Sequence, residues 1–167
     1  MGDGKANTAD MIDLIADEVN SILNKRQKER YFDSVMLLYS VIENLLKWIV
    51  YTDIVWEKYS KKILRVTKNA RREEKEIHRF CKRLSFYNAL RIALARGWLD
   101  YRLYKKVEEI RVERNNVVHQ LWIYHHRHNR LVIRKKLEKL ALVTNDLVGV
   151  LSGMVKRIGV DEILDLL

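Results

Sequence analysis

The stretch YFDSVMLLYSVIENLLKWIVYTDIVWEKY, residues 31–59, decides the fold class of this 167-residue chain. Its apolar residues recur at intervals of three and four, which is helical spacing, and they cover more than half of the helix circumference. A helix that is apolar over so much of its surface is typical of the centre of a bundle. The positions that follow this spacing are Val35, Leu38, Tyr39, Ile42, Leu45, Leu46, Ile49 and Val50.

Further helices are expected on both sides of this central segment. Helical spacing of apolar residues predicts helices over about 10–23, 77–96, 101–125 and 131–157, with a short terminal helix capped by Asp161. The chain contains no proline, which favours helices joined by short turns. We therefore expect an all-α, up-and-down bundle of four to five helices.

Turn residues set the expected boundaries of these helices. Gly97 can end the helix before it, because glycine tolerates the left-handed conformation of a helix stop, and Asp100 can cap the next helix. Residues 60–76 break the apolar pattern and indicate a basic connection, either a mobile loop or a solvated helix. HHRHNR, residues 125–130, indicates a polar turn whose histidines lack the spacing of a good metal site.

Composition points to one domain in a reducing compartment. We assign residues 1–9 to a flexible N-terminus and 10–167 to a single helical domain. Cys81 is the only cysteine, so an internal disulfide is excluded and a structural thiol in the core or at its flank is expected. No continuous apolar run reaches the roughly 18 residues that span a bilayer, and no secretory signal is visible. We expect a cytoplasmic protein that neither binds membrane nor requires a cofactor or metal.

The net charge of +10 is unevenly distributed and suggests a polyanionic partner. Residues 61–83 contain ten Lys or Arg against three Glu, and residues 127–139 contain six against one. Nucleic acid is favoured over membrane, while a solvated basic helix face remains the alternative. Candidate contacts to an RNA backbone are Lys68, Arg71, Arg72, Arg127 and Arg130.

The helix over 101–125 places a cation on its apolar side. Its apolar stripe includes Val107, Ile110 and Val117, and the spacing that leads on from Ile110 reaches Arg114. An unpaired buried charge costs several kcal/mol at least, so such an arginine must be paired or used. Glu43, which lies within the apolar surface of the central helix, is the expected partner.

The stretch RNNVVH, residues 114–119, combines side chains that suit RNA cleavage. His119 can exchange a proton near neutral pH, Arg114 can bind a phosphate with a planar fork of donors, and Asn115 can orient either group. Asn115 and His119 are four apart and share a helix face, while Arg114 flanks it. Together they suit attack of a 2′-hydroxyl on its own phosphate without a metal, although an ordinary structural histidine is the alternative.

This stretch resembles the R-N-x-x-x-H form of the R-x(4–6)-H motif of HEPN domains (higher eukaryotes and prokaryotes nucleotide-binding). RGWLD at 96–100, the helix that follows it and the acid within SVIENLLKWIV at 40–50 agree with that family. The resemblance implies a HEPN-like bundle that forms a homodimer, joining two motifs in one cleft as a metal-independent endoribonuclease. It implies catalytic roles for Arg114 and His119 and a supporting role for Asn115; Glu43 is added from the helix pattern.

The resemblance also implies a biological setting, with alternatives. Ribonucleases of this family act in prokaryotic toxin–antitoxin and defence systems, where the partner is an antitoxin or a nucleotidyltransferase. The tyrosine that such a transferase modifies is replaced here by Leu121, which puts that regulation in doubt. Some members are non-catalytic modules for dimerisation or for binding a partner, nucleic acid or nucleotide. Aromatic residues that could stack on bases, although aromatics at such spacings more often pack, are Trp98, Tyr101, Tyr104 and Trp122.

Overall fold

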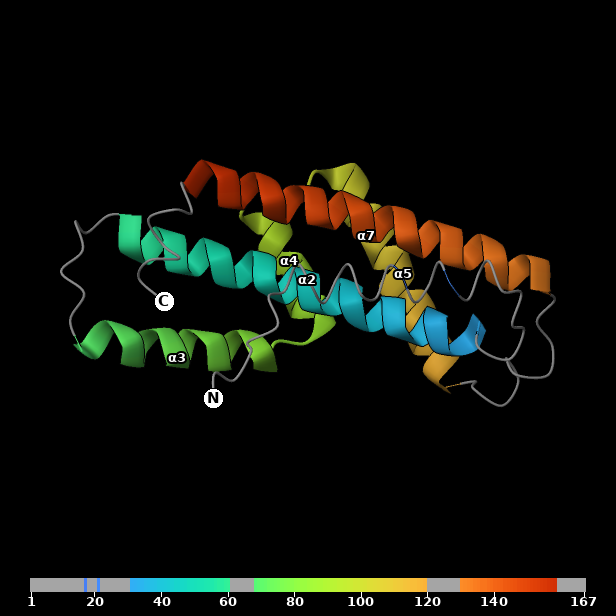
Figure 1. The fold of residues 1–167 in the computed structure, drawn as a ribbon, viewed down its shortest axis with the longest axis horizontal. Helices are drawn as coiled ribbons and strands as arrows, with labels where there is room; N and C mark the ends of the chain where they lie inside the picture. The colour runs from blue at the N-terminus through green and yellow to red at the C-terminus, as the bar shows by residue number, and fades with distance from the viewer. Residues whose placement is uncertain (1–16, 18–20, 22–30, 61–67, 120–129, 159–167) are drawn as a thin grey trace.

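The computed structural model describes residues 17, 21, 31–60, 68–119 and 130–158. Over these residues it is an all-α bundle of five helices without a strand, which confirms the predicted fold class (Figure 1). The helices are α2 (Tyr31–Ser60), α3 (Lys68–Arg83), α4 (Phe86–Ala95), α5 (Tyr101–His119) and α7 (Arg130–Ile158).

Helix α2 is the centre of the bundle, as its apolar pattern predicted. All eight of the apolar positions predicted in it are buried, and Tyr39, Ile42, Leu46 and Ile49 are fully enclosed. The helix packs most extensively against α7 and also contacts α3, α4 and α5. Burial of this stripe on several sides supplies the main driving force for assembly, since apolar surface removed from water stabilises the fold in proportion to its area.

The segment Asp33–Lys58 of α2 is long and apolar enough to cross a membrane by length and composition alone. Half of its most apolar 18-residue window is buried inside the bundle. The central helix of a bundle meets the same test, because it must be apolar on several faces.

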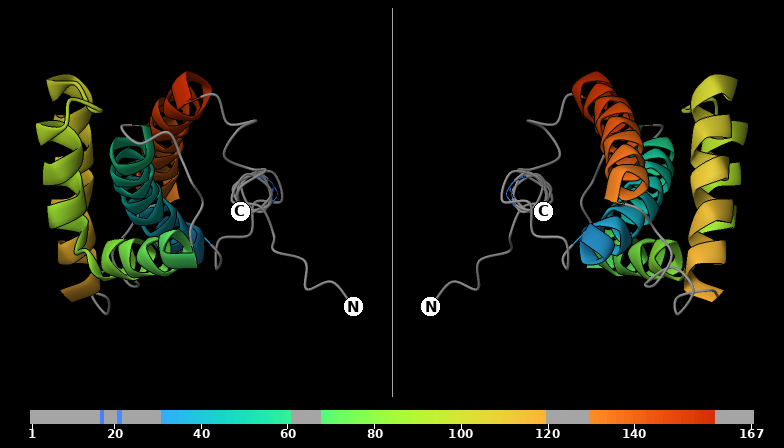
Figure 2. Two further views of the ribbon diagram at one scale, coloured as in Figure 1. Left: turned by 90° about the vertical axis from the view of Figure 1, so that its left-hand side faces the viewer. Right: turned by 90° about the vertical axis from the view of Figure 1, so that its right-hand side faces the viewer.

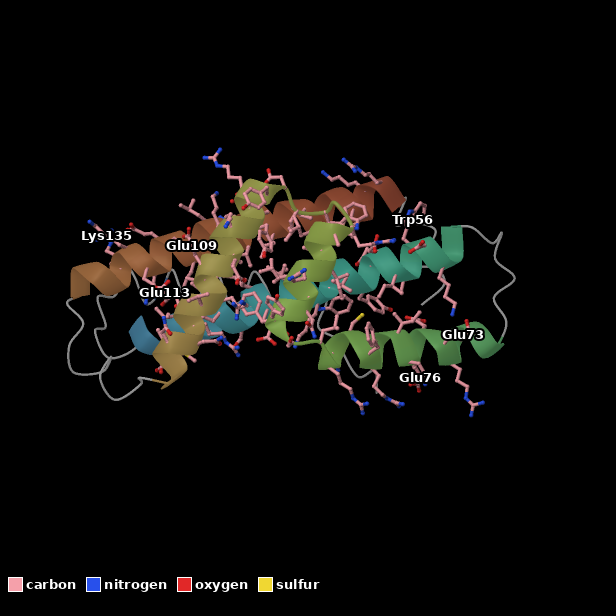
Figure 3. The ribbon with its side chains drawn as sticks, turned by 180° about the vertical axis from the view of Figure 1, so that it is seen from behind. Trp56, Glu73, Glu76, Glu109, Glu113 and Lys135 are labelled. Carbon is pink, nitrogen blue, oxygen red and sulfur yellow. The ribbon has the colours of Figure 1, made fainter. Side chains whose placement is uncertain are left out.

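Contacts between helices define their directions. Helix α3 runs back along the C-terminal half of α2, and Lys58 forms an ion pair with Glu73 at 2.5 Å. Helix α5 runs antiparallel to α7, with ion pairs Lys106–Asp146, Glu109–Lys139 and Glu113–Lys136. Glu109 and Glu113 extend from α5 towards α7 in Figure 3. Figure 2 shows α4 and α5 as an outer pair against α2 and α7, with α3 along one edge.

The single helix predicted over 77–96 is wrong, because α3 ends at Arg83 and α4 starts at Phe86. Between them, Ser85 has an extended backbone, and its Oγ accepts a hydrogen bond from the backbone N–H of Asn88 at 3.2 Å. A serine N-cap starts a new helix through a polar contact that does not interrupt the apolar spacing. The apolar pattern therefore continues across the boundary between α3 and α4 and does not reveal it.

The predicted stop and cap after α4 are confirmed. Gly97 has φ +75°, the left-handed conformation that ends a helix. The Oδ1 of Asp100 accepts a hydrogen bond from the N–H of Leu103 at 2.7 Å and caps α5. Residues 68–76, expected as loop or solvated helix, are helical and belong to α3.

Several predicted features lie outside the described residues. Asp17 is helical, but most of the helix predicted over 10–23 falls outside the described ranges. The same holds for the extension of α5 to 125, for nearly all of the turn at 125–130 and for the terminal helix capped by Asp161.

Candidate functional site

Arg114 and Glu43 form the ion pair that the sequence predicted. A terminal guanidinium nitrogen (Nη2) of Arg114 on α5 lies 3.2 Å from Oε2 of Glu43 on α2. The other carboxylate oxygen of Glu43 lies 2.8 Å from Nζ of Lys47, one turn further along α2. Lys47 also donates a hydrogen bond to the backbone carbonyl of Lys82 on α3 at 3.4 Å. Glu43 therefore connects the motif helix to α2 and, through Lys47, to the end of α3.

The pair lies at the margin of the core rather than within it. The side chain of Glu43 is 18% exposed and that of Arg114 is 32% exposed, whereas Ile110 and Val117 on the same stripe are fully buried. Partial burial shields the pair from water and salt and so strengthens it over a surface pair. About a third of the Arg114 side chain remains accessible to solvent.

The other motif residues follow Arg114 along α5. Asn115 is exposed, and His119 is the last residue of α5 that the structure describes, with only its backbone described. Helical geometry places positions 115 and 119 within about 40° of each other around the helix axis. The structure thus brings Arg114 to Glu43 and leaves Asn115 exposed on the neighbouring side of α5.

The predicted RNA-binding residues are only partly described. Arg72 is an exposed residue of α3. It precedes Lys82, the end of α3 that contacts Lys47, by ten positions, which corresponds to about 15 Å along a helix. The structure therefore does not bring Arg72 to Arg114. Lys68, Arg71 and Arg130 have a described helical backbone only, and Arg127 lies outside the described residues.

A cluster of tyrosines and cations lies on α4 and α5. From the sequence, only its Tyr101 and Tyr104 were considered for base stacking, and the cluster as a whole was not predicted. On α4, Arg91 donates a hydrogen bond to the hydroxyl of Tyr87 at 2.8 Å. The guanidinium carbons of Arg91 and Arg111 lie 5.6 and 5.2 Å from the centre of the Tyr87 ring. Both distances are within the range of cation–π attraction. The hydrogen bond to Tyr87 raises the pKa of Arg91, and Arg111, which hydrogen-bonds Glu108, lowers the pKa of that carboxyl group.

The start of α5 continues this cluster. The rings of Tyr101 and Tyr104 stack with centroids 6.1 Å apart, and Nζ of Lys105 lies 5.3 Å from the centroid of Tyr101. Base stacking and packing were both considered for these two tyrosines. Tyr101 is 64% exposed and does not pack in the core, whereas Tyr104 packs in part against it. Helical spacing aligned the aromatic residues along α5, but only the packed structure shows which of them α4 leaves uncovered.

A buried carboxylate holds the α4–α5 turn against α2. Asp53 is 5% exposed and accepts hydrogen bonds from Nε of Arg96 at 2.6 Å and from the indole N–H of Trp98 at 2.7 Å. Arg96 also reaches Glu57 with Nη2 at 2.6 Å. Trp98 is thus a structural residue. The cluster sets the position of α5 and hence of the Arg114–Glu43 pair.

The remaining candidate chemistry is limited. Cys81 is buried as predicted, and burial raises its pKa to about 11, so the thiol is neutral at neutral pH and a poor nucleophile. In the described part of the chain, no group of three or more His, Cys, Asp or Glu is arranged to hold a metal ion.

Comparison with known proteins adds no relative. No protein-family model, curated protein or solved structure matches the chain. The function is therefore inferred from the motif, from the contacts of its arginine and from the charge of the surface around it.

Proposed function

We propose that the protein is a metal-independent endoribonuclease whose site forms where the motifs of two copies meet. The observation that carries this proposal is the Arg114–Glu43 ion pair. It holds the arginine of a motif suited to phosphodiester cleavage at the edge of the core, with about a third of the side chain accessible. A fixed cation is effective in catalysis because it needs little reorganisation when charge develops.

In the proposed reaction, the 2′-oxygen of a ribose attacks the adjacent phosphorus and the bond from phosphorus to the 5′-oxygen breaks. The neutral imidazole of one His119 removes the proton of the 2′-hydroxyl, and the protonated imidazolium of the other copy's His119 gives its proton to the departing 5′-oxygen. Arg114 stabilises the charged phosphorane, and Asn115 orients the phosphate or the imidazole. The products are a 2′,3′-cyclic phosphate and a 5′-hydroxyl. Glu43 acts as a positioning residue for Arg114.

The resemblance to HEPN ribonucleases also suggests the biological system in which the protein acts. The protein would serve as the toxin or effector of a prokaryotic toxin–antitoxin or defence system in the cytoplasm. Its partner would be an antitoxin or a nucleotidyltransferase.

A non-catalytic module for dimerisation or for nucleic-acid or nucleotide binding is the second candidate. It is favoured by the same ion pair, because a carboxylate that already neutralises Arg114 is also what a purely structural arginine would have. A plain helical scaffold predicts only a loss of stability when Arg114 is removed.

Cleavage of labelled RNA in EDTA separates these candidates. We expect the wild-type chain to cleave with chelator present, and His119→Ala to lower the rate by about 10²- to 10⁴-fold. Arg114→Ala should lower it by about 10²- to 10³-fold. Arg157→Ala, which removes an exposed arginine near the end of α7 and outside both basic blocks, is the matched control and should cleave normally. Circular dichroism melts report whether each variant is folded, and intact RNA with the folded wild-type chain would contradict the proposal.

A further inference from the structure

One exposed surface of the outer helix pair combines aromatic rings with cations. We call it the tyrosine–cation face and define it as Tyr87, Arg91, Tyr101, Tyr104, Lys105 and Arg111. Tyr87 and Tyr101 are 41% and 64% exposed, although burying each ring would stabilise the fold. The Tyr87 and Tyr101 rings lie beside neighbouring cations and remain accessible to solvent.

The face continues along α5 towards the candidate site. Tyr101, Lys105, Glu108, Val112 and Asn115 follow one another at steps of four, three, four and three, so they lie along one side of the helix. Val112 is 45% exposed, and Tyr101, Lys105 and Asn115 are exposed as well. At 1.5 Å per residue, the stripe covers about 21 Å from Tyr101 to Asn115. Position 119 continues it in register.

The charge of the face favours a polyanion over a second copy of the chain. Arg91, Lys105 and Arg111 are cationic, and the acid at its centre, Glu108, is bound by Arg111 through two hydrogen bonds at 2.7 and 2.8 Å. Two identical copies packed through this face would bring like charges together, which opposes association. Phosphates between the cations would be attracted, and bases could stack on the rings.

We propose that the tyrosine–cation face binds single-stranded RNA and leads the strand along α5 to Arg114. The inference deepens the proposed function and rests on it for the choice of RNA as the strand. Every base presents a flat π-surface to an exposed tyrosine ring, so binding is tolerant of sequence. In a duplex the bases are stacked on one another and cannot reach the rings, so the face selects unpaired strands.

The binding experiment uses the full chain carrying His119→Ala, so that RNA is not consumed. Fluorescence anisotropy with a fluorescein-labelled uridine 20-mer at fixed salt measures the affinity. We expect Tyr101→Ala to weaken binding about 5- to 100-fold, the usual effect of losing one base–aromatic stack, and Tyr101→Phe to keep most of the affinity. Because Tyr101 lies largely outside the core, these variants should fold normally.

A second pair of variants isolates the charge. Lys105→Gln on the face and Lys156→Gln near the end of α7 make the same change in net charge at exposed positions. We expect only Lys105→Gln to weaken binding and to lower the dependence of log affinity on log salt by about one. Equal effects of the two substitutions would overturn the inference in favour of general charge attraction.

Further outcomes separate this inference from the proposed function. If the wild-type chain cleaves RNA while Tyr101→Ala binds as tightly as Tyr101→Phe, RNA binding by the tyrosine–cation face is contradicted and the proposed ribonuclease activity is supported. If RNA is never cleaved but Tyr101→Ala still loses affinity, RNA binding by the tyrosine–cation face is supported and the proposed ribonuclease activity is contradicted. Equal affinity for a duplex, or a dimer in sedimentation that Tyr101→Ala dissociates without changing RNA binding, would also overturn the inference.

Discussion

Asp53 is the residue on which the placement of α5 most directly depends. Its carboxylate is almost fully buried and satisfied by Arg96 and Trp98. Asp53→Asn keeps the size of the side chain but removes the charge and one acceptor. We expect it to lower the free energy of unfolding by about 2–4 kcal/mol, measured by urea denaturation, because breaking a buried charge network leaves its partners unsatisfied.

Glu57→Gln is the matched control for Asp53→Asn. Glu57 binds the same Arg96, but its side chain is 46% exposed. An ion pair in such contact with water contributes about 1 kcal/mol or less. Equal losses in the two variants would show that burial of Asp53 is not what makes the cluster stabilising.

The Arg114–Glu43 pair could be predicted from the sequence, whereas the exposure of Tyr101 could not. Arg114 and Glu43 were paired from the sequence because each interrupts an apolar stripe, and a charge in such a place needs a partner. For Tyr101 the sequence left packing and base stacking both open, since an aromatic residue at helical spacing suits a core and a surface equally. Which faces of α5 are covered depends on the position of α4.

Two glycines distinguish a helix end from a helix interior. Gly97 ends α4 with φ +75°, and Gly149 lies within α7, and at neither position would an added Cβ meet an atom within 4 Å. We expect Gly97→Ala to destabilise the fold by about 1 kcal/mol, because the left-handed conformation is unfavourable for alanine. Gly149→Ala should stabilise it by about 0.5–1 kcal/mol, because alanine has the higher helix propensity.

Thermal and urea unfolding of both glycine variants measure these effects. Since neither substitution creates a steric clash, opposite signs can only come from the backbone. Two shifts of the same sign would contradict this assignment of Gly97 as the stop of α4.

At the scale of the whole molecule, the proposed site requires two copies. We expect the chain to sediment as a dimer at micromolar concentration, with a thermal midpoint that rises with protein concentration, because association stabilises the folded state by mass action. Lys156→Gln changes an exposed residue near the end of α7, far along the chain from the motif, and should leave the sedimentation unchanged. A monomer at every concentration would contradict a shared cleft.

The sequence by itself determined the all-α class, the buried stripe of α2, the glycine stop and aspartate cap around the α4–α5 turn, and the Arg114–Glu43 pair. These are local or periodic properties, and apolar spacing, left-handed glycine and a misplaced charge can all be read along one chain. Only the tertiary structure decided that Ser85 separates α3 from α4, that Asp53 ties the α4–α5 turn to α2, and that Tyr101 lies in solvent. Ser85 acts through a local polar contact that the apolar spacing does not record. The roles of Asp53 and Tyr101 depend on which helices cover which faces, and packing between segments far apart in sequence sets that.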